Sequence, residues 1–279
     1  MLQNSYDGKP TLYLISTPIG NLDDITYRSV KILNDVDVIF SEDTRVTLNL
    51  LNYLGINKKL IALHEHNEDM AKEKVLEYLK NGNNIALVTD RGTPIISDPG
   101  YKTVKYITDN DYNVVALPGP TAFVPALITS GLAPQPFLFY GFLDSKDSLK
   151  RSELERLSDE EETIIFYEAP HRIIRTLSMM LDIFGDRNIS ISREISKKFE
   201  TIYRGKISDV INIIPEKGEF VIIVEGVKDK IVDNNITIKD AVDNYIRTGF
   251  DVMTSIKKVA KDRNVPKNVI YKEYHKEDN

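Results

Sequence analysis

Short apolar runs alternate with amphipathic stretches through the first half of the chain. In each run Ile, Val and Leu occupy consecutive positions, which is typical of parallel strands covered on both faces. Residues 67–82 place Val75, Leu76 and Leu79 on one stripe, which predicts a helix with Asn67 as its cap. Strands and helices alternating at this spacing predict right-handed βαβ units and an open parallel sheet. The predicted strands are 12–17, 37–42, 59–64, 84–90 and 113–119.

The second half of the chain has a different pattern. The apolar runs 188–194 and 199–205 are only a few residues apart, which favours an antiparallel hairpin over a parallel pair. The second sheet is therefore expected to be mixed. Its other predicted strands are 137–143, 162–168 and 219–226, and its predicted helices are 146–157 and 172–185.

Beyond an acidic, polar segment at 228–235, which we interpret as a linker, the pattern predicts helices only. Residues 255–276 carry seven Lys or Arg residues against two acidic ones, and two apolar stripes separated by a turn. This arrangement resembles a small helix-turn-helix with a basic outer face. On charge alone, a solvated face of a helical bundle is as good an interpretation as a nucleic-acid contact. We predict an α/β protein with a parallel domain at 11–119, a mixed-sheet domain at 120–228 and a basic helical tail at 236–279.

Composition narrows the class of protein. A chain of 279 residues that is 42% hydrophobic and 28% charged is an ordinary globular protein. The absence of Cys excludes disulfides, thiolate metal sites and a Cys nucleophile. A polar start and the lack of an apolar stretch of about 20 residues predict a cytoplasmic protein with no membrane contact. The net charge of −6 argues against a uniformly basic surface but leaves room for a local basic face. No metal is expected, since the His64 and His66 pair is better explained as a hydrogen-bonded loop.

Loops rich in Gly and Pro follow several predicted strands. They read TPIGN at 17–21, TDRGTPIISDPG at 89–100 and LPGPTA at 117–122. In open α/β sheets, ligands bind at the carboxyl ends of the strands, so three such loops together predict a ligand crevice. Any one of them alone is more often only a turn. None matches the dinucleotide or phosphate-loop pattern, so the residues leave the chemistry of the ligand open.

These loops stand in order with further motifs, namely SEDTR at 41–45, HEHNE at 64–68, FYEAPHR at 166–172 and REISKKFE at 193–200. Together they resemble the bacterial 16S ribosomal RNA cytidine 2′-O-ribose methyltransferases of the tetrapyrrole-methylase superfamily, over about residues 12–227. The basic tail also resembles the C-terminal helical domain of those enzymes. The resemblance implies two α/β domains with S-adenosylmethionine in the cleft between them. It also implies a homodimer that methylates a cytidine in the decoding region of the small ribosomal subunit.

The resemblance also assigns roles to single residues. Two positions depart from the expected pattern, because Arg91 replaces a small residue and Ala169 replaces a serine. The residues that the resemblance implies for cofactor binding are Pro18, Gly20, Asp90, Gly92, Thr93, Ile95, Thr121, Ala122, Tyr167, Glu168, Glu225 and Gly226.

A ribose hydroxyl is a poor nucleophile, so a base or a nearby cation should help it to lose its proton. Lys197 and Lys198 are the candidates, as a neutral amine or as an ammonium group, and Glu200 and Glu42 are rivals for the role of base. For any one lysine, a surface salt bridge is the commoner role. The candidates for contact with RNA phosphates or with substrate are Arg28, Arg45, His171, Arg172, Arg193, Lys257, Lys258, Lys261 and Lys267.

Two other functions fit parts of the pattern. A tetrapyrrole methyltransferase of the cobalamin or sirohaem pathway would share the fold, but a porphyrinoid substrate needs neither the charged motifs nor the basic tail. A non-catalytic RNA-binding module would keep the fold without binding the cofactor.

Overall fold

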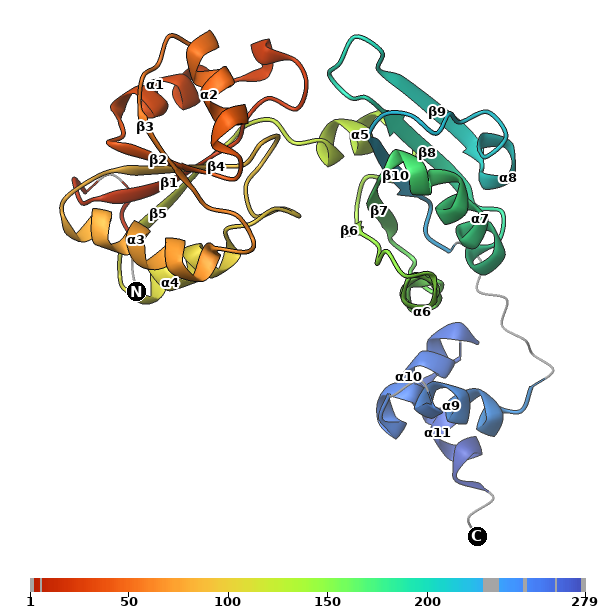
Figure 1. Ribbon diagram of the computed structural model, residues 1–279. Helices are drawn as coiled ribbons and strands as arrows, with labels where there is room; N and C mark the ends of the chain where they lie inside the picture. The colour runs from red at the N-terminus through yellow and green to blue at the C-terminus, as the bar shows by residue number, and fades with distance from the viewer. Residues whose placement is uncertain (1–2, 6, 228–235, 248–249, 264, 277–279) are drawn as a thin grey trace. The chain divides into compact units, whose positions relative to one another are not determined.

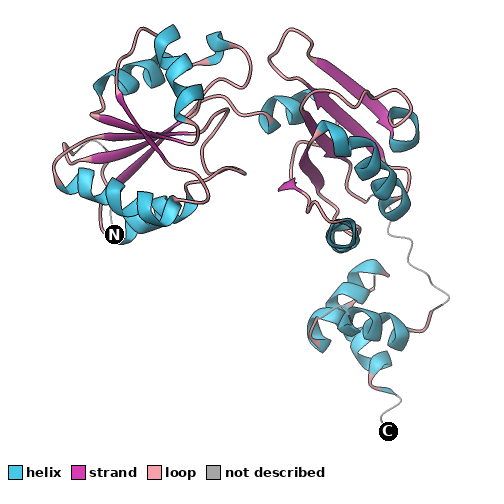
Figure 2. Cartoon of the chain, in the orientation of Figure 1, coloured by secondary structure: helices cyan, strands magenta, loops and turns pink. Residues whose placement is uncertain are grey.

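The computed structural model describes residues 3–5, 7–227, 236–247, 250–263 and 265–276. The chain forms two compact units, Met1–Gly226 and Val227–Asn279. The first unit contains two five-stranded sheets and the second contains helices only (Figure 2). The predicted linker at 228–235 lies outside the described residues.

The first sheet is entirely parallel, as the apolar runs predicted. Its strand order is β3-β2-β4-β1-β5. Each strand begins and ends within two residues of the predicted run. The strands are β1 (Thr11–Ile15), β2 (Val38–Ser41), β3 (Lys59–Ala62), β4 (Ile85–Val88) and β5 (Asn113–Leu117).

Helices cover both faces of this sheet (Figure 1). The helices α3 (Glu68–Lys80) and α4 (Tyr101–Asp109) pack on one face, where Val75 and Leu76 meet Leu12. The helices α1 (Tyr27–Asp35) and α2 (Thr44–Tyr53) pack on the other face, where Leu33 and Leu51 meet Ile15. Adjacent strand residues point to opposite faces, so burial of both sets explains the continuous apolar runs.

The helix predicted at 67–82 forms at 68–80, but Asn67 does not cap it through its side chain. The amide of Asn67 donates to the carbonyl of Ala62, and its oxygen accepts from the backbone N–H of His64. Asn67 therefore closes the loop before the helix instead of capping the first turn.

The second sheet is mixed, as predicted, with the order β6-β7-β10-β8-β9. The strand β6 (Phe137–Phe142) runs parallel to β7 (Thr163–Glu168), whereas β10 (Phe220–Val224) runs antiparallel to β7 and to β8 (Asn188–Arg193). The predicted hairpin forms between β8 and β9 (Thr201–Lys206).

Helices also cover the second sheet on both faces (Figure 1). One face packs against α6 (Asp147–Leu157), α7 (Ile173–Phe184) and the short α8 (Ile207–Val210). On the other face α5 (Phe123–Thr129) packs through Ala126 and Leu127. Two 3₁₀ helices complete this unit, η1 (Leu22–Asp24) and η2 (Pro170–Arg172).

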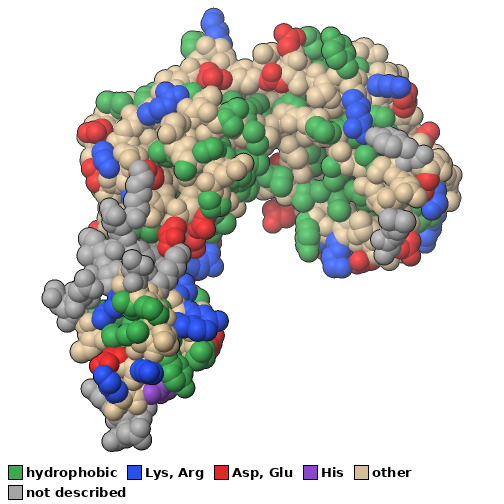
Figure 3. Space-filling view, turned by 180° about the vertical axis from the view of Figure 1, so that it is seen from behind, with side chains coloured by type: hydrophobic (Ala, Val, Ile, Leu, Met, Phe, Trp, Pro, Cys, Tyr) green, Lys and Arg blue, Asp and Glu red, His purple; other side chains and the backbone are tan. Residues whose placement is uncertain are grey.

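The second unit is built from α9 (Ile238–Arg247), α10 (Val252–Asp262) and α11 (Lys267–Tyr274). The three helices share one core, to which Val242, Ile256 and Ile270 contribute fully buried side chains. Figure 3 shows hydrophobic side chains and Lys or Arg side chains on the same visible face of this unit. Among the described residues of the whole chain, no helix combines the length and the apolarity needed to cross a bilayer.

Candidate active site

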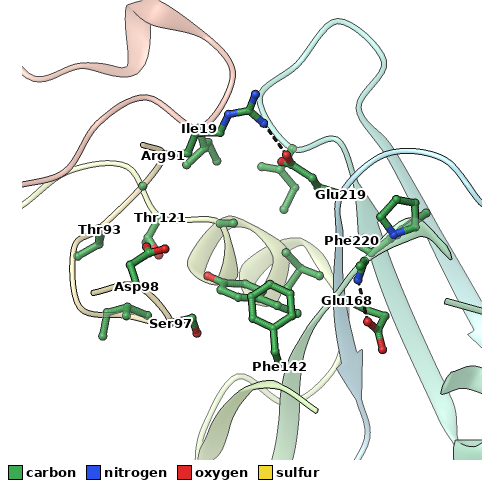
Figure 4. Close-up of a pocket in the computed structure, with 18 residues that line it drawn as sticks. Ile19, Arg91, Thr93, Ser97, Asp98, Thr121, Phe142, Glu168, Glu219 and Phe220 are labelled. Carbon is green, nitrogen blue, oxygen red and sulfur yellow. Dashed lines mark hydrogen bonds and ion pairs between the residues drawn. The ribbon is translucent and has the colours of Figure 1, made fainter. Parts of the chain in front are cut away.

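A cavity of about 370 Å³ opens in the first unit, within the size range of ligand sites. It is lined by the loops that follow β1, β4 and β5, and by the adjoining ends of β7 and β10 (Figure 4). The carboxyl ends of parallel strands meet at one sheet edge, which explains why the three Gly/Pro loops come together. Six residues implied for cofactor binding line the cavity, namely Gly92, Thr93, Thr121, Ala122, Tyr167 and Glu168.

The Thr93 hydroxyl ties these loops to one another. It lies 3.0 Å from the Ser16 hydroxyl and donates to the carbonyl of Pro120, also at 3.0 Å. Thr17 and Gly92 exchange two backbone hydrogen bonds of 2.9 and 3.0 Å. Gly92 has a φ of +84°, a backbone conformation that a residue with a side chain rarely adopts. One wall of the cavity is therefore held by bonds between loops far apart in the sequence.

Four other residues implied for cofactor binding support these loops but are absent from the cavity wall. Pro18 is buried and Ile95 packs against the backbone of Gly100. Asp90 accepts a hydrogen bond from the backbone N–H of Asp43 at 2.9 Å. Gly20 lies beneath the side chain of Lys197.

Glu225 and Gly226 lie at the opposite end of β10 from the cavity. Because β10 runs antiparallel to β7, its amino end meets the carboxyl end of β7, where Phe220 pairs with Glu168. Glu225 instead accepts a hydrogen bond from the Asn188 side chain at 2.5 Å. A Cβ at Gly226 would lie 2.1 Å from the carbonyl oxygen of Glu161, so close packing requires this glycine. We therefore correct their assignment and place neither residue in the candidate site.

The carboxylate of Glu168 turns away from the cavity into the protein (Figure 4). It accepts hydrogen bonds from the Thr176 hydroxyl at 2.5 Å and from the Ala169 backbone N–H at 2.8 Å. Lys150 Nζ lies 3.6 Å away, and both side chains of this pair are 1% exposed. Only the backbone and inner stem of Glu168 are thus available to a ligand.

Arg172 adjoins this buried group, and its bonds inside the protein do not support the RNA contact expected from the sequence. Its Nε lies 3.0 Å from Glu168 Oε1 at an angle too poor for a hydrogen bond, and its Nη2 donates to the carbonyl of Leu143 at 2.7 Å. The guanidinium is therefore engaged inside the protein. The neighbouring His171 is exposed and does not line the cavity, so its contact with substrate stays a prediction.

Asp98 is a cavity residue that the sequence analysis missed. Burial raises its pKa to about 7, and the negative charges of Glu42 and Asp90 add to that shift, against a hydrogen bond from Thr89. Glu42 accepts from the Thr89 hydroxyl at 2.7 Å and does not line the cavity, which argues against its role as the base. The only sequence signal for Asp98 was its place in the loop at 89–100.

Lys197 does not itself line the cavity, but it is the catalytic candidate whose charged end bonds to a lining residue, Glu219. Its Nζ donates to Glu194 Oε1 and to Glu219 Oε2, each at 2.9 Å, and Glu219 lines the cavity. Arg91 reaches Glu219 from the opposite side of the cavity and donates to Oε1 at 2.5 Å (Figure 4). The unexpected arginine at position 91 is therefore an ion-pair partner at this end of the cavity.

The other two catalytic candidates face solvent. Lys198 is exposed and its Nζ lies 5.6 Å from the centre of the Phe199 ring. Glu200 is exposed and accepts from the backbone N–H of Ser196 at 2.6 Å. Neither residue lines the cavity.

The remaining RNA candidates are spread over both units. Arg28 in α1 and Arg45 in α2 are exposed, and Arg45 forms an ion pair with Asp43. Arg193 donates to the carbonyl of Lys217 at 2.5 Å. In the second unit Lys257 and Lys267 are exposed, Lys258 lies over the rings of Tyr245 and Phe250, and the side chain of Lys261 is outside the described residues.

In the described part of the chain, no three His, Asp or Glu side chains are grouped to hold a metal ion. The rings of His64 and His66 lie 6.0 Å apart, edge to face.

Two α/β sheets with a cavity at their strand ends are the architecture of a protein that binds a small-molecule ligand at those ends. A family model described as tetrapyrrole (corrin/porphyrin) methylases matches residues 11–211. The chain therefore belongs to the tetrapyrrole-methylase family of methyltransferases, in the group that ribosomal RNA small subunit methyltransferase I represents.

Several relatives carry the name ribosomal RNA small subunit methyltransferase I. The chain is 48% identical to the protein of Bacillus subtilis over 98% of both chains, and 43% identical to that of Halalkalibacterium halodurans over 99% of both. It is 44% identical to that of Vibrio cholerae over 80% of both chains. The fold resembles the uroporphyrin-III-C-methyltransferase of Thermus thermophilus, with a TM-score of 0.55 and 14% identity over 77% of this chain and 94% of that one.

Proposed function

We propose that this protein methylates a cytidine of the small-subunit ribosomal RNA, in the decoding region, on the ribose 2′-hydroxyl. The names of the relatives support ribosomal RNA of the small subunit as the substrate. The observation that carries the choice of a hydroxyl acceptor is Lys197, whose Nζ is bonded to a carboxylate of the cavity wall.

Methylases of this family take the methyl group from S-adenosylmethionine, the cofactor predicted from the sequence. When bound, this cofactor supplies an electrophilic methyl group on a sulfonium cation. The residues of the cavity fit this cofactor. Apolar side chains of the wall can contact its adenine ring, and the carboxyl group of Asp98 can face its positively charged part. Thr93, Thr121, Ala122 and the backbone of Tyr167 would hold it, with Asp98 as the acidic group.

Lys197 acts as a cation in this proposal. Its Nζ donates to two carboxylates at once, as charge-assisted hydrogen bonds. An ammonium group near the acceptor stabilises the negative charge that builds on the oxygen as the hydroxyl loses its proton. Glu219, which lines the cavity beside Lys197, is the candidate to receive that proton.

The test is methyl transfer from labelled S-adenosylmethionine to unmodified small ribosomal subunits. We expect Lys197→Ala to lower kcat about 100-fold, the scale of losing one transition-state stabilising group, with the affinity for the cofactor kept. Lys217→Ala serves as the matched control, because Lys217 is an exposed lysine on a neighbouring loop. Normal kcat in Lys197→Ala would reject the proposed role of Lys197.

The alternatives make different predictions. A non-catalytic RNA-binding module would show no heat of S-adenosylmethionine binding in calorimetry. A tetrapyrrole methylase would transfer label to a porphyrinoid and none to the ribosomal subunit. Homodimerisation and a cytoplasmic location stay predictions, the latter following from a ribosomal substrate.

A further inference from the structure

We propose that Glu194 is the positioning residue for Lys197, and that Gly20 and Gly218 lack side chains so that this pair can form. The inference rests on the proposed function of Lys197 and extends it to residues away from the cavity wall.

Hydrogen bonds of Glu194 connect the β8–β9 loop to the loop that precedes β10. Glu194 Oε1 accepts from Lys197 Nζ at 2.9 Å and from the backbone N–H of Glu219 at 3.0 Å. In return the backbone N–H of Glu194 donates to the carbonyl of Glu219 at 3.0 Å. The carboxylate thus joins the lysine in the β8–β9 loop to the residue that directly precedes β10 at the cavity.

The backbone of the β8–β9 loop adopts an unusual conformation to make these bonds. Glu194 has a φ of +55° and Ser196 a φ of +65°, a region that residues other than glycine rarely occupy. Such conformations persist where the surrounding structure holds them, often at functional sites. Here the hydrogen bonds of Glu194 supply that restraint.

Hydrogen bonds and neighbouring positive charges keep Glu194 an anion. Burial raises its pKa, but the hydrogen bonds from Lys197 and Glu219 and the charges of Lys197 and Arg193 outweigh burial and lower it overall. The side chains of Glu194 and Lys197 are each 19% exposed. A half-buried, ionised partner holds an ammonium group in place more firmly than a surface carboxylate does.

Two glycines leave room for this ion pair. A Cβ at Gly218 would lie 2.8 Å from Glu194 Cγ, and Gly218 has a φ of +99°. A Cβ at Gly20 would lie 2.3 Å from Lys197 Cγ, so the stem of the lysine runs directly over this glycine. The TPIGN loop therefore packs against the side chain of Lys197, and this role is distinct from contact with the cofactor.

A double-mutant cycle tests the proposal with the full-length protein and small ribosomal subunits. Glu194→Gln is expected to lower kcat about 10- to 100-fold, the effect of a misplaced catalytic group, with the KM for S-adenosylmethionine unchanged. In the Lys197→Ala background the same substitution should cause no further loss, because Glu194 acts only through Lys197. Glu216→Gln is the matched control, since it removes an exposed carboxylate from the loop before β10.

Equal losses from Glu194→Gln in both backgrounds, or no loss in the wild-type background, would overturn the inference while the role of Lys197 stands. Normal kcat in Lys197→Ala would overturn both the inference and the role of Lys197.

Gly20→Ala distinguishes two roles of the TPIGN loop, namely packing against Lys197 and contact with the cofactor. We expect a fall in kcat with unchanged cofactor affinity, whereas lost affinity with normal kcat would assign Gly20 to the cofactor and contradict the inference.

Discussion

Lys150 and Glu168 form a buried ion pair directly behind the cavity. Burial lowers the pKa of Lys150, and the charge of Glu168 beside it raises it again in part. The pair, with Thr176 and Arg172, fixes the end of β7 from which Tyr167 and Ala169 reach the cavity. Residue type and spacing drew attention to Glu168, but only the fold shows that its carboxylate faces inward.

Removing the buried cation should therefore destabilise the protein. Lys150→Met is expected to lower the free energy of unfolding by about 1–3 kcal/mol, because Thr176 and Glu168 lose a buried donor while Arg172 stays beside the Glu168 carboxylate. Urea unfolding followed by circular dichroism measures this loss. Arg151→Met, on the exposed side of the same helix, should change stability little. Equal losses in the two variants would contradict the account.

The raised pKa of Asp98 predicts how the stability of the protein depends on pH. The folded pKa of about 7 lies above that of the unfolded chain, so the folded state binds this proton more tightly. Its contribution to stability is therefore fully present at acid pH and is lost as pH rises towards 7. The melting temperature of Asp98→Asn should exceed that of the wild type by more at pH 8 than at pH 5. A constant difference between the two proteins would reject the raised pKa.

At the scale of the element, the strands and the helices α3, α6 and α7 could be predicted closely from the sequence. Continuous apolar runs identified the parallel strands, since burial on both faces leaves little room for polar residues. The short spacing of β8 and β9 was enough to predict their hairpin. The loops were also recognised, because Gly and Pro mark the strand ends.

What the sequence could not supply was the direction of neighbouring elements and of their side chains. Glu225 and Gly226 end a strand next to β7, but β10 is antiparallel, so its carboxyl end lies away from the cavity. Arg172 could not be recognised as buried, because its partners Leu143 and Glu168 come from other elements. Such features depend on long-range packing, which local pattern does not encode.

Gly226→Ala tests the correction at the end of β10. The added methyl group would collide with the backbone of Glu161, so we expect the free energy of unfolding to fall by about 1–3 kcal/mol, as for overpacked sites. Cofactor affinity of the folded protein should stay at the wild-type value in calorimetry. Weakened binding by a fully folded, equally stable variant would return Gly226 to the cofactor site.

At the scale of the whole molecule, the second unit has its own core and adds basic surface. We predict that a chain ending at residue 235 loses affinity for ribosomal RNA while it keeps its affinity for S-adenosylmethionine. Filter binding with RNA, repeated at increasing salt, should show a shallower salt dependence for the shortened chain, because fewer phosphates are contacted. Equal losses of RNA and cofactor affinity would refute separate roles for the two units.

The central claim is transfer of a methyl group to a ribose hydroxyl of a cytidine in the small ribosomal subunit. The most direct measurement is nucleoside mass spectrometry of RNA from unmodified small subunits that have been incubated with the protein and S-adenosylmethionine. The account predicts a new 2′-O-methylcytidine, strongly reduced with Lys197→Ala. A methyl group on a base, or subunits that remain unmethylated by a protein that binds S-adenosylmethionine, would contradict it.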